Sequence, residues 1–140
     1  PLDRTGEVLE APDNFMLVVS YNPGYQNFLK GMKPSTRQRF ISIRFDFPAV
    51  KLEQQILSNE SGASEDVVKR LVSLGNALRR LKDHDLEEAA STRLLIYAAR
   101  LIKSGFDPVE SCRCSLVEPL TDDLETAEAL MEIARATFGK

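Results

Sequence analysis

Three short segments of the chain carry side chains suited to chemistry on a phosphate group. Asn22 lies in the turn sequence Ser-Tyr-Asn-Pro-Gly, directly after an apolar run. Arg37 and Arg39 come just before a strand-like segment, and Arg93 lies near the start of an amphipathic one. An amide can orient a water beside a phosphate oxygen, and an arginine can stabilise charge on a transferring phosphoryl group. These four residues are therefore candidates for a nucleotide site.

Each of these segments also has an ordinary structural explanation. Asn-Pro-Gly favours a turn whatever its role, and two arginines on an exposed turn can simply be solvated charge. Arg93 is expected in the first turn of a helix, where a cation opposes the helix dipole at a cost of up to ~1 kcal/mol. Its charge calls for a nearby anion, either a nucleotide phosphate or a carboxylate of the same domain. No G-x-x-x-x-G-K-[ST] loop and no complete catalytic set occur in the sequence.

Composition argues against two classes of partner. The 140 residues carry a formal net charge of −3 and contain no basic block. Because a non-specific grip on nucleic acid needs clustered Lys and Arg, we expect no nucleic-acid partner. No apolar run reaches the ~18 residues that a membrane span needs, so no membrane span is expected either.

The candidate residues of the first part of the chain must be positioned by strands and turns. Residues 15–20 form a continuous apolar run of the kind buried on both faces of a parallel sheet. Residues 40–47 alternate between polar and apolar side chains, which predicts a second strand with one apolar face. A hairpin is predicted over residues 2–11 around Thr5-Gly6. A single helical turn is predicted at residues 34–38.

The rest of the chain predicts a helical bundle that could pack its own core. Ser64 and Ser91 have the side chains of N-caps, and a stripe of Val and Leu follows Ser64 at helical spacing. Asp122 and Asp123 are better explained as a helix cap than as a metal site. The predicted helices cover residues 49–59, 64–82, 91–104, 108–118 and 121–138.

The change of pattern near Pro48 predicts two domains. Residues 1–48 would be the C-terminal part of an α/β core, and residues 49–140 a helical domain. Two buried strands do not make a stable α/β sheet alone. The remaining strands are therefore expected from residues outside this chain or from other copies.

Four longer segments, taken in order, resemble one known family. They are Ser-Tyr-Asn-Pro-Gly-Tyr at 20–25, Lys-Pro-Ser-Thr-Arg-Gln-Arg-Phe at 33–40, Ala-Ser-Thr-Arg-Leu-Leu-Ile-Tyr-Ala-Ala-Arg-Leu-Ile at 90–102 and Pro-Leu-Thr-Asp-Asp at 119–123. Together they resemble the CbbQ/NorQ/NirQ group, which belongs to the MoxR branch of AAA+ ATPases. The resemblance implies ATP hydrolysis in a ring-forming protein that remodels a client enzyme.

The resemblance implies a role for each candidate residue. Asn22 is similar to the sensor 1 residue, which positions the attacking water. Arg39, or alternatively Arg37, is similar to the arginine finger that reaches the nucleotide of a neighbouring subunit. Arg93 is similar to the sensor 2 arginine of the helical lid, which touches the phosphates of its own subunit. The predicted hairpin resembles the insertion before sensor 1.

The sequence departs from this family in one large respect. The phosphate-binding loop and the acidic motif for Mg²⁺ and water are absent from the 140 residues. ATP and Mg²⁺ would therefore be held mainly by residues outside this chain, since phosphoryl transfer needs the loop lysine, the backbone cradle and the metal together. We expect no ATP hydrolysis by this chain alone.

The resemblance also implies partners and a location. A homohexamer, a partner protein with a von Willebrand factor A domain and a bacterial cytoplasmic location are expected, with carboxysome association as one form of it. Overall similarity favours Rubisco as the client, which would make the protein a CbbQ-type activase. The alternative is a NorQ/NirQ-type maturation factor for nitric oxide reductase. A rival from a different class is a non-catalytic helical interaction module, in which the arginines only bind a partner.

Overall fold

A computed structural model describes residues 6, 8, 10–20, 33–85 and 89–139 of the chain. The chain divides into two compact units, Pro1–Ser42 and Ile43–Lys140, each of which is described by itself. The predicted hairpin at residues 2–11 lies largely outside the described residues, and Asn22 lies wholly outside them. The functional division at Pro48 stays a prediction.

The first unit contains one described helix, α2, at Pro34–Arg37. Pro34 occupies the first turn, where its missing N–H costs no hydrogen bond and its fixed φ favours a helix. The backbone N–H of Gln38 donates to the carbonyl of Pro34 and closes the turn. The single helical turn predicted at this position is confirmed.

The predicted parallel sheet is not seen in the described residues, which contain no strand. Residues 15–20 and 40–47 have no regular structure, and most of their large apolar side chains are exposed, with Met16 80% and Ile41 94% accessible. The physical reason is that a strand needs ladder hydrogen bonds from a neighbouring strand and a surface that buries its apolar face. No described segment offers either, so only the helical part of the predicted fold is confirmed.

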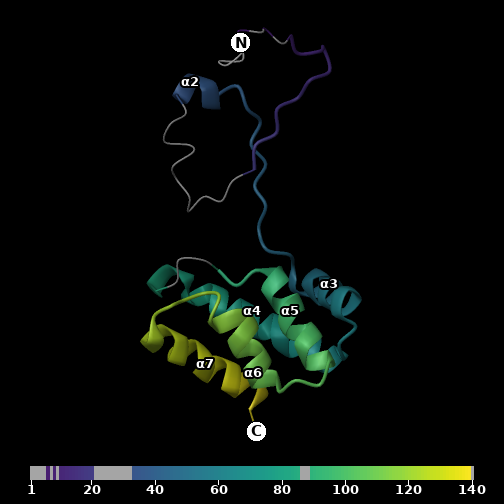
Figure 1. Cartoon of the computed structure of the whole chain (residues 1–140), viewed down its shortest axis with the longest axis vertical. Helices are drawn as coiled ribbons and strands as arrows, with labels where there is room; N and C mark the ends of the chain where they lie inside the picture. The colour runs from purple at the N-terminus through teal and green to yellow at the C-terminus, as the bar shows by residue number, and fades with distance from the viewer. Residues whose placement is uncertain (1–5, 7, 9, 21–32, 86–88, 140) are drawn as a thin grey trace. The chain divides into compact units, whose positions relative to one another are not determined.

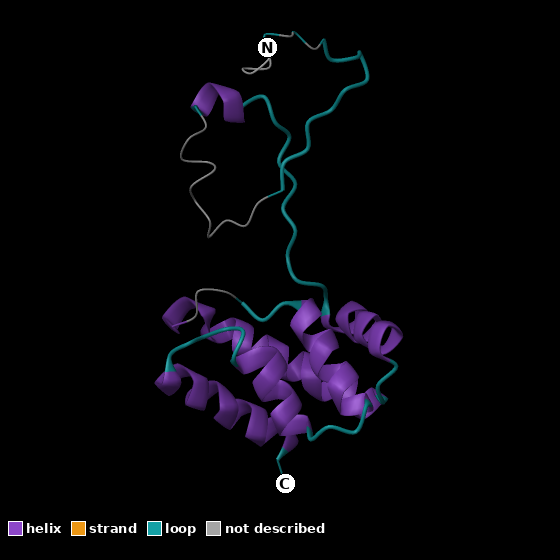
Figure 2. Ribbon diagram, viewed as in Figure 1, coloured by secondary structure: helices purple, strands orange, loops and turns teal. Residues whose placement is uncertain are grey.

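The second unit is a bundle of packed helices (Figures 1 and 2). The predicted helical segments are confirmed, although the fourth is split by a wider π-helical turn. The elements are α3 at Val50–Ser61, α4 at Glu65–Asp85, α5 at Thr92–Lys103, α6 at Pro108–Cys112, the π-helix η1 at Arg113–Val117 and α7 at Leu124–Phe138.

Local signals set where these helices begin and end. The Oγ of Ser91 accepts a hydrogen bond from the backbone N–H of Leu94 and caps α5. The carboxylate of Asp123 accepts one from the N–H of Thr126 at 2.8 Å and caps α7, as predicted. Gly62 ends α3 in the left-handed region at φ 62°, a conformation that glycine adopts without strain.

Two helices are central to the core of the bundle: α4 contacts α3, α5 and α7, and α5 contacts α3, α4, α6 and η1. The predicted apolar stripe of α4 faces this core, because Leu71, Leu74 and Leu78 are at most 1% accessible. Leu95 of α5 is also fully buried, and each such leucine stabilises the fold by ~1.5–3 kcal/mol relative to exposure. The helical unit therefore has its own apolar core.

The two cysteines, Cys112 and Cys114, lie two residues apart and are both free. Cys112 is buried, and the cost of desolvating a thiolate, helped by the nearby charge of Asp107, raises its pKa to about 12. Cys114 is exposed. Cys112 is therefore a protonated core residue at neutral pH.

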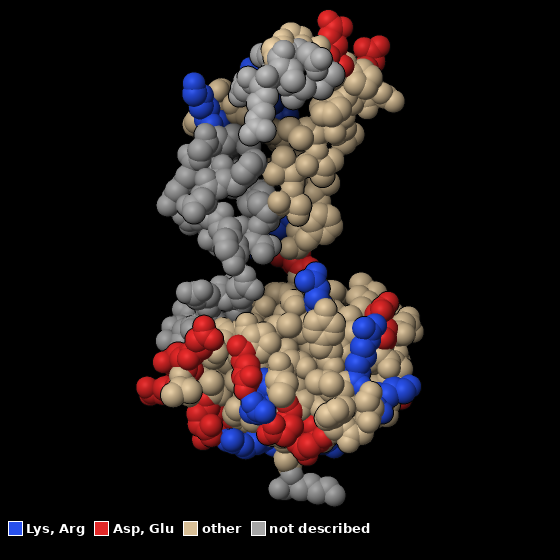
Figure 3. Space-filling model, in the orientation of Figure 1, with Lys and Arg blue, Asp and Glu red and all other residues tan. Residues whose placement is uncertain are grey.

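Charged side chains of both signs lie on the drawn face of the helical unit (Figure 3). Several form exposed pairs within one helix, such as Lys69 with Glu65 at 2.6 Å and Arg135 with Glu128 at 2.6 Å. Exposed pairs of this kind contribute little to stability. No described helix is both long and apolar enough to cross a membrane.

Candidate functional site

Arg93 lies in the first turn of α5, two residues after the N-cap Ser91. Its side chain is exposed, and the first turn of α5 contains no acidic residue. Among the described residues, none forms an ion pair or side-chain hydrogen bond with its guanidinium. The helix N-terminus and the guanidinium both favour an anion here. Arg93 is therefore a candidate ligand for a phosphate group.

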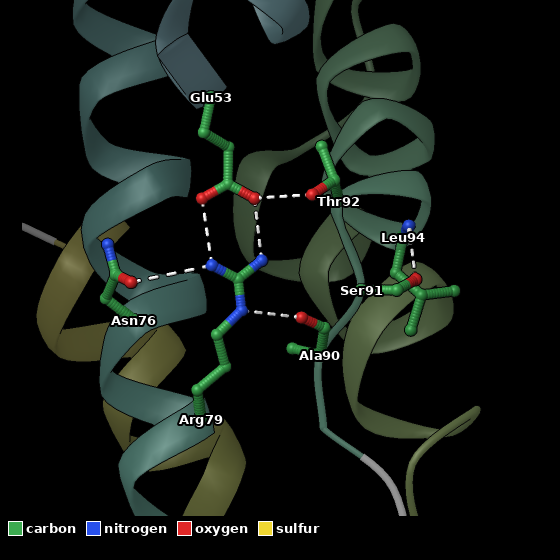
Figure 4. Close-up of polar contacts among 7 residues, drawn as sticks. All are labelled: Glu53, Asn76, Arg79, Ala90, Ser91, Thr92 and Leu94. Carbon is green, nitrogen blue, oxygen red and sulfur yellow. Dashed lines mark hydrogen bonds and ion pairs between the residues drawn. The ribbon is translucent and has the colours of Figure 1, made fainter. Parts of the chain in front are cut away.

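A buried ion pair lies beneath this turn of α5 (Figure 4). Glu53 of α3 is 0% accessible, and its carboxylate accepts two hydrogen bonds from the guanidinium of Arg79 of α4. Nη1 of Arg79 lies 2.8 Å from Oε2, and Nη2 lies 2.6 Å from Oε1. This two-point geometry is the strong form of an arginine–carboxylate contact.

The same pair holds the backbone and side chain on either side of Ser91. Nε of Arg79 donates to the carbonyl of Ala90 at 2.8 Å, and the Thr92 hydroxyl donates to Oε1 of Glu53 at 2.7 Å. The segment Ala90-Ser91-Thr92-Arg93 therefore has four distinct roles. In order, these residues accept from Arg79, cap the helix, donate to Glu53 and present a cation to solvent.

The charge state of the pair follows from its surroundings. Burial by itself raises the pKa of Glu53, because it penalises a carboxylate. Hydrogen bonds from Arg79 and Thr92, together with the positive charge of Arg79, outweigh that effect and hold the pKa below its ordinary value of 4.5. Glu53 is therefore ionised at neutral pH, and the pair is a true ion pair.

An aromatic ring covers the guanidinium of Arg79. The ring of Phe47 lies 3.9 Å from the guanidinium carbon, measured to the ring centroid, in a cation–π contact. Phe47 precedes Pro48 and α3, so the segment that leads into the bundle touches the ion pair directly. Every buried side-chain nitrogen and oxygen of the described residues has a hydrogen-bond partner.

The other predicted site residues lie in the first unit or outside the described residues. Arg37 is the last residue of α2, and nothing is described of its side chain. Arg39 is exposed, two residues beyond α2. Asn22 lies outside the described residues. The roles of Asn22, Arg37, Arg39 and Arg93 all stay predictions.

Neither Glu53 nor Arg79 is among the site residues predicted from the sequence. A signal for Glu53 was present: it lies four residues before Leu57, which places a carboxylate on the buried face of α3. Arg79 directly follows the buried Leu78 at the edge of the apolar stripe. An unpaired buried charge is too costly, so a charged residue at a core position requires a partner, but the sequence alone does not say which residue that partner is.

Comparison with known proteins agrees with the resemblance of the sequence. Residues 53–137 match the CbbQ/NirQ/NorQ C-terminal family. The chain is 67% identical over 132 residues to the denitrification regulatory protein NirQ of Pseudomonas aeruginosa. The aligned residues make up 94% of this chain and 51% of that protein. The chain is 51% identical over 139 residues to the protein NorQ of Paracoccus denitrificans, covering 99% of this chain and 52% of that one.

The expected preference for a CbbQ identity is not supported. The protein CbbQ of Hydrogenophilus thermoluteolus is 46% identical over 138 residues, covering 99% of this chain and 52% of that protein. This identity is lower than those to the NirQ and NorQ proteins. The chain spans about half the length of the curated relatives that it matches. The family match extends over more than half of the chain, and the chain therefore belongs to the CbbQ/NirQ/NorQ C-terminal family.

Proposed function

We propose that this chain is the C-terminal part of a ring-forming AAA+ ATPase of the NirQ/NorQ type, which uses ATP hydrolysis to remodel a client enzyme. The observation that carries the proposal is Arg93, a free cation at the start of α5 in a bundle that matches this family. Its charge opposes the helix dipole at a cost of up to ~1 kcal/mol, which a bound phosphate would offset.

The client is proposed from the comparisons. Identity to the NirQ and NorQ proteins exceeds that to the CbbQ protein, so the expected lean towards Rubisco gives way to the alternative. We propose maturation of nitric oxide reductase as the task, in partnership with a protein that carries a von Willebrand factor A domain. The name of the Pseudomonas relative, a denitrification regulatory protein, supports this class of client.

The chain's own residues would complete a nucleotide site that other residues begin. ATP would supply the phosphoryl group, and Mg²⁺ would neutralise charge on its phosphates. Arg93 would bind the phosphates of its own subunit, and Asn22 would orient the attacking water. Arg39, with Arg37 as the alternate, would reach the nucleotide of the neighbouring subunit. Six subunits would close such a ring through head-to-tail contacts.

Arginine substitutions in the full-length protein test this assignment. Arg93→Ala and Arg39→Ala should each reduce ATP turnover at least about tenfold, which corresponds to ~1.4 kcal/mol of transition-state stabilisation. Turnover is measured by phosphate release at saturating ATP and Mg²⁺.

Arg135→Ala is the matched control, because Arg135 is another exposed arginine of the bundle and pairs only with Glu128 among the described residues. It should leave turnover unchanged. Near-normal rates in both Arg93→Ala and Arg39→Ala would contradict the assignment, as would robust turnover by the purified 140-residue chain.

A further inference from the structure

We propose that Glu53, Arg79 and Thr92 act together as a positioning unit for Arg93, fixing the first turn of α5 so that the Arg93 side chain leaves the helix towards a nucleotide phosphate. The inference deepens the proposed function and rests on the proposed role of Arg93. None of the three residues needs to touch the nucleotide. They would act through the backbone of the turn that carries Arg93.

The geometry places the unit where it can control this turn. The Arg79 guanidinium holds the carbonyl of Ala90 at 2.8 Å, and the Glu53 carboxylate holds the Thr92 hydroxyl at 2.7 Å. These two attachments lie immediately before and immediately after the N-cap Ser91. Arg93 is the next residue of the helix. Because backbone angles are fixed within a helix, anchoring both sides of the cap fixes the direction in which Cβ of Arg93 points.

The chemistry of the unit exceeds what the stability of the bundle requires. Among the buried residues that the structure describes, Glu53 is the one carboxylate, and leucine, valine and alanine fill most other core positions. Replacing a buried ion pair by apolar side chains is often neutral or stabilising, so such a pair is weak evidence for a role in stability. What an apolar contact does not provide is a directional bond to a backbone carbonyl and to a hydroxyl. Both of these bonds end on the turn that carries Arg93.

The unit also reaches the segment before the bundle. Phe47 covers the Arg79 guanidinium at 3.9 Å, and Pro48 and Ala49 connect Phe47 to α3. The flat face of the Arg79 guanidinium therefore contacts Phe47, in the segment before α3, and the Nε–H at its edge donates to Ala90, just before α5. A displacement of Phe47 would act on the group that holds Ala90.

The test is a double-substitution cycle in the full-length protein, measured by the dissociation constant of a fluorescent ATP analogue and by ATP turnover. Thr92→Val keeps the branched shape of the side chain and removes its hydroxyl. We expect it to weaken analogue binding or turnover by about three- to tenfold, the loss that corresponds to one typical hydrogen bond. Combined with Arg93→Ala, it should add no further loss, because a positioning residue has nothing left to position.

Two further variants separate positioning from folding. Thr92→Ser retains the hydroxyl and should restore wild-type values. Thr137→Val removes a hydroxyl that donates within α7, to the carbonyl of Ile133 at 2.8 Å, and should leave both readouts unchanged. Thermal unfolding of each variant shows whether a loss of binding merely follows a loss of fold.

Each outcome bears on one of the two proposals. If the double variant loses the product of the two single fold-changes, Thr92 acts independently of Arg93 and the positioning role is overturned. Wild-type values for Thr92→Val alone would also overturn it. A failure of Thr92→Ser to restore the readouts would also count against it. If Arg93→Ala itself changes neither binding nor turnover, the proposed function of Arg93 fails, and the positioning role fails with it.

Discussion

At the scale of single residues, the bundle is organised around a charged pair rather than around apolar contacts alone. Glu53 and Arg79 are 26 residues apart in the chain and meet through two hydrogen bonds. The carboxylate of Glu53 is 0% accessible, so its hydrogen-bond partners, rather than solvent, stabilise its charge and hold its pKa below the ordinary value. Removing one member would leave the other buried and unpaired. This would lower the free energy of unfolding by more than the intact pair contributes to it.

A double-mutant cycle on this pair measures that asymmetry. Glu53→Gln and Arg79→Met should each lower the free energy of unfolding by ~3–5 kcal/mol, because each leaves an uncompensated buried group. The double variant should cost clearly less than the sum of the two. Urea unfolding gives the values, and the exposed pair of Glu128 and Arg135 is the control whose removal should change little. Simple additivity at the buried pair would show that the two side chains do not interact.

The pair should also make stability depend on pH in a definite direction. The pKa of Glu53 is lowered in the folded state, so its contribution is fully present above the ordinary value of 4.5. It is lost as the pH falls through the lower folded value, because the unfolded state then binds more protons than the folded state. The difference in unfolding free energy between wild type and Glu53→Gln should therefore be constant from pH 7 to about pH 5. It should shrink in more acidic solution, and a difference that grew on acidification would contradict the sign.

At the scale of the elements, the residue at the C-cap position decides where a helix ends. Gly62 ends α3 at φ 62°, where a side chain is strained. Gly62→Ala should lower the free energy of unfolding by about 1 kcal/mol, and Gly62→Asn should cost less because Asn tolerates this conformation. Thermal or urea unfolding of the two variants checks the order. An Ala variant as stable as the Asn variant would show that the left-handed backbone is not what limits this position.

The helices could be predicted from sequence because their signals are local. Ser91 and Asp123 mark helix starts, and Leu71, Leu74 and Leu78 repeat at helical spacing and are buried as expected. The π-helical turn at Arg113–Val117 carries no such signal, because the predicted helix over 108–118 has the same apolar pattern with or without it.

The strands and the ion pair could not be predicted in the same way. An apolar run such as 15–20 becomes a strand only when a neighbour pairs with it, and the described residues supply no such neighbour. The contact of Glu53 with Arg79 joins different helices, so it depends on how these helices pack. The position of Arg93 in the first turn of α5 could be predicted, because the N-cap Ser91 lies two residues before it.

At the scale of the whole molecule, the chain is proposed to be one part of a ring-forming ATPase. It spans about half the length of its curated relatives, and its family match begins at residue 53, within α3. In the proposed ring, one subunit contributes Arg93 and its neighbour contributes Arg39 to the same nucleotide. Arg93 and Arg39 of any one subunit would therefore serve two different nucleotides in the proposed ring.

Mixing two inactive variants of the full-length protein tests this central claim most directly. Arg39→Ala and Arg93→Ala subunits are combined under conditions that allow exchange, and ATP turnover is compared with that of each variant alone. At a junction where an Arg39→Ala subunit binds the nucleotide and an Arg93→Ala subunit supplies the finger, both arginines are intact. The account predicts recovery of roughly a quarter of wild-type turnover in a random equal mixture of a closed head-to-tail ring. Turnover that stays at the level of the separate variants, with exchange demonstrated, would contradict it.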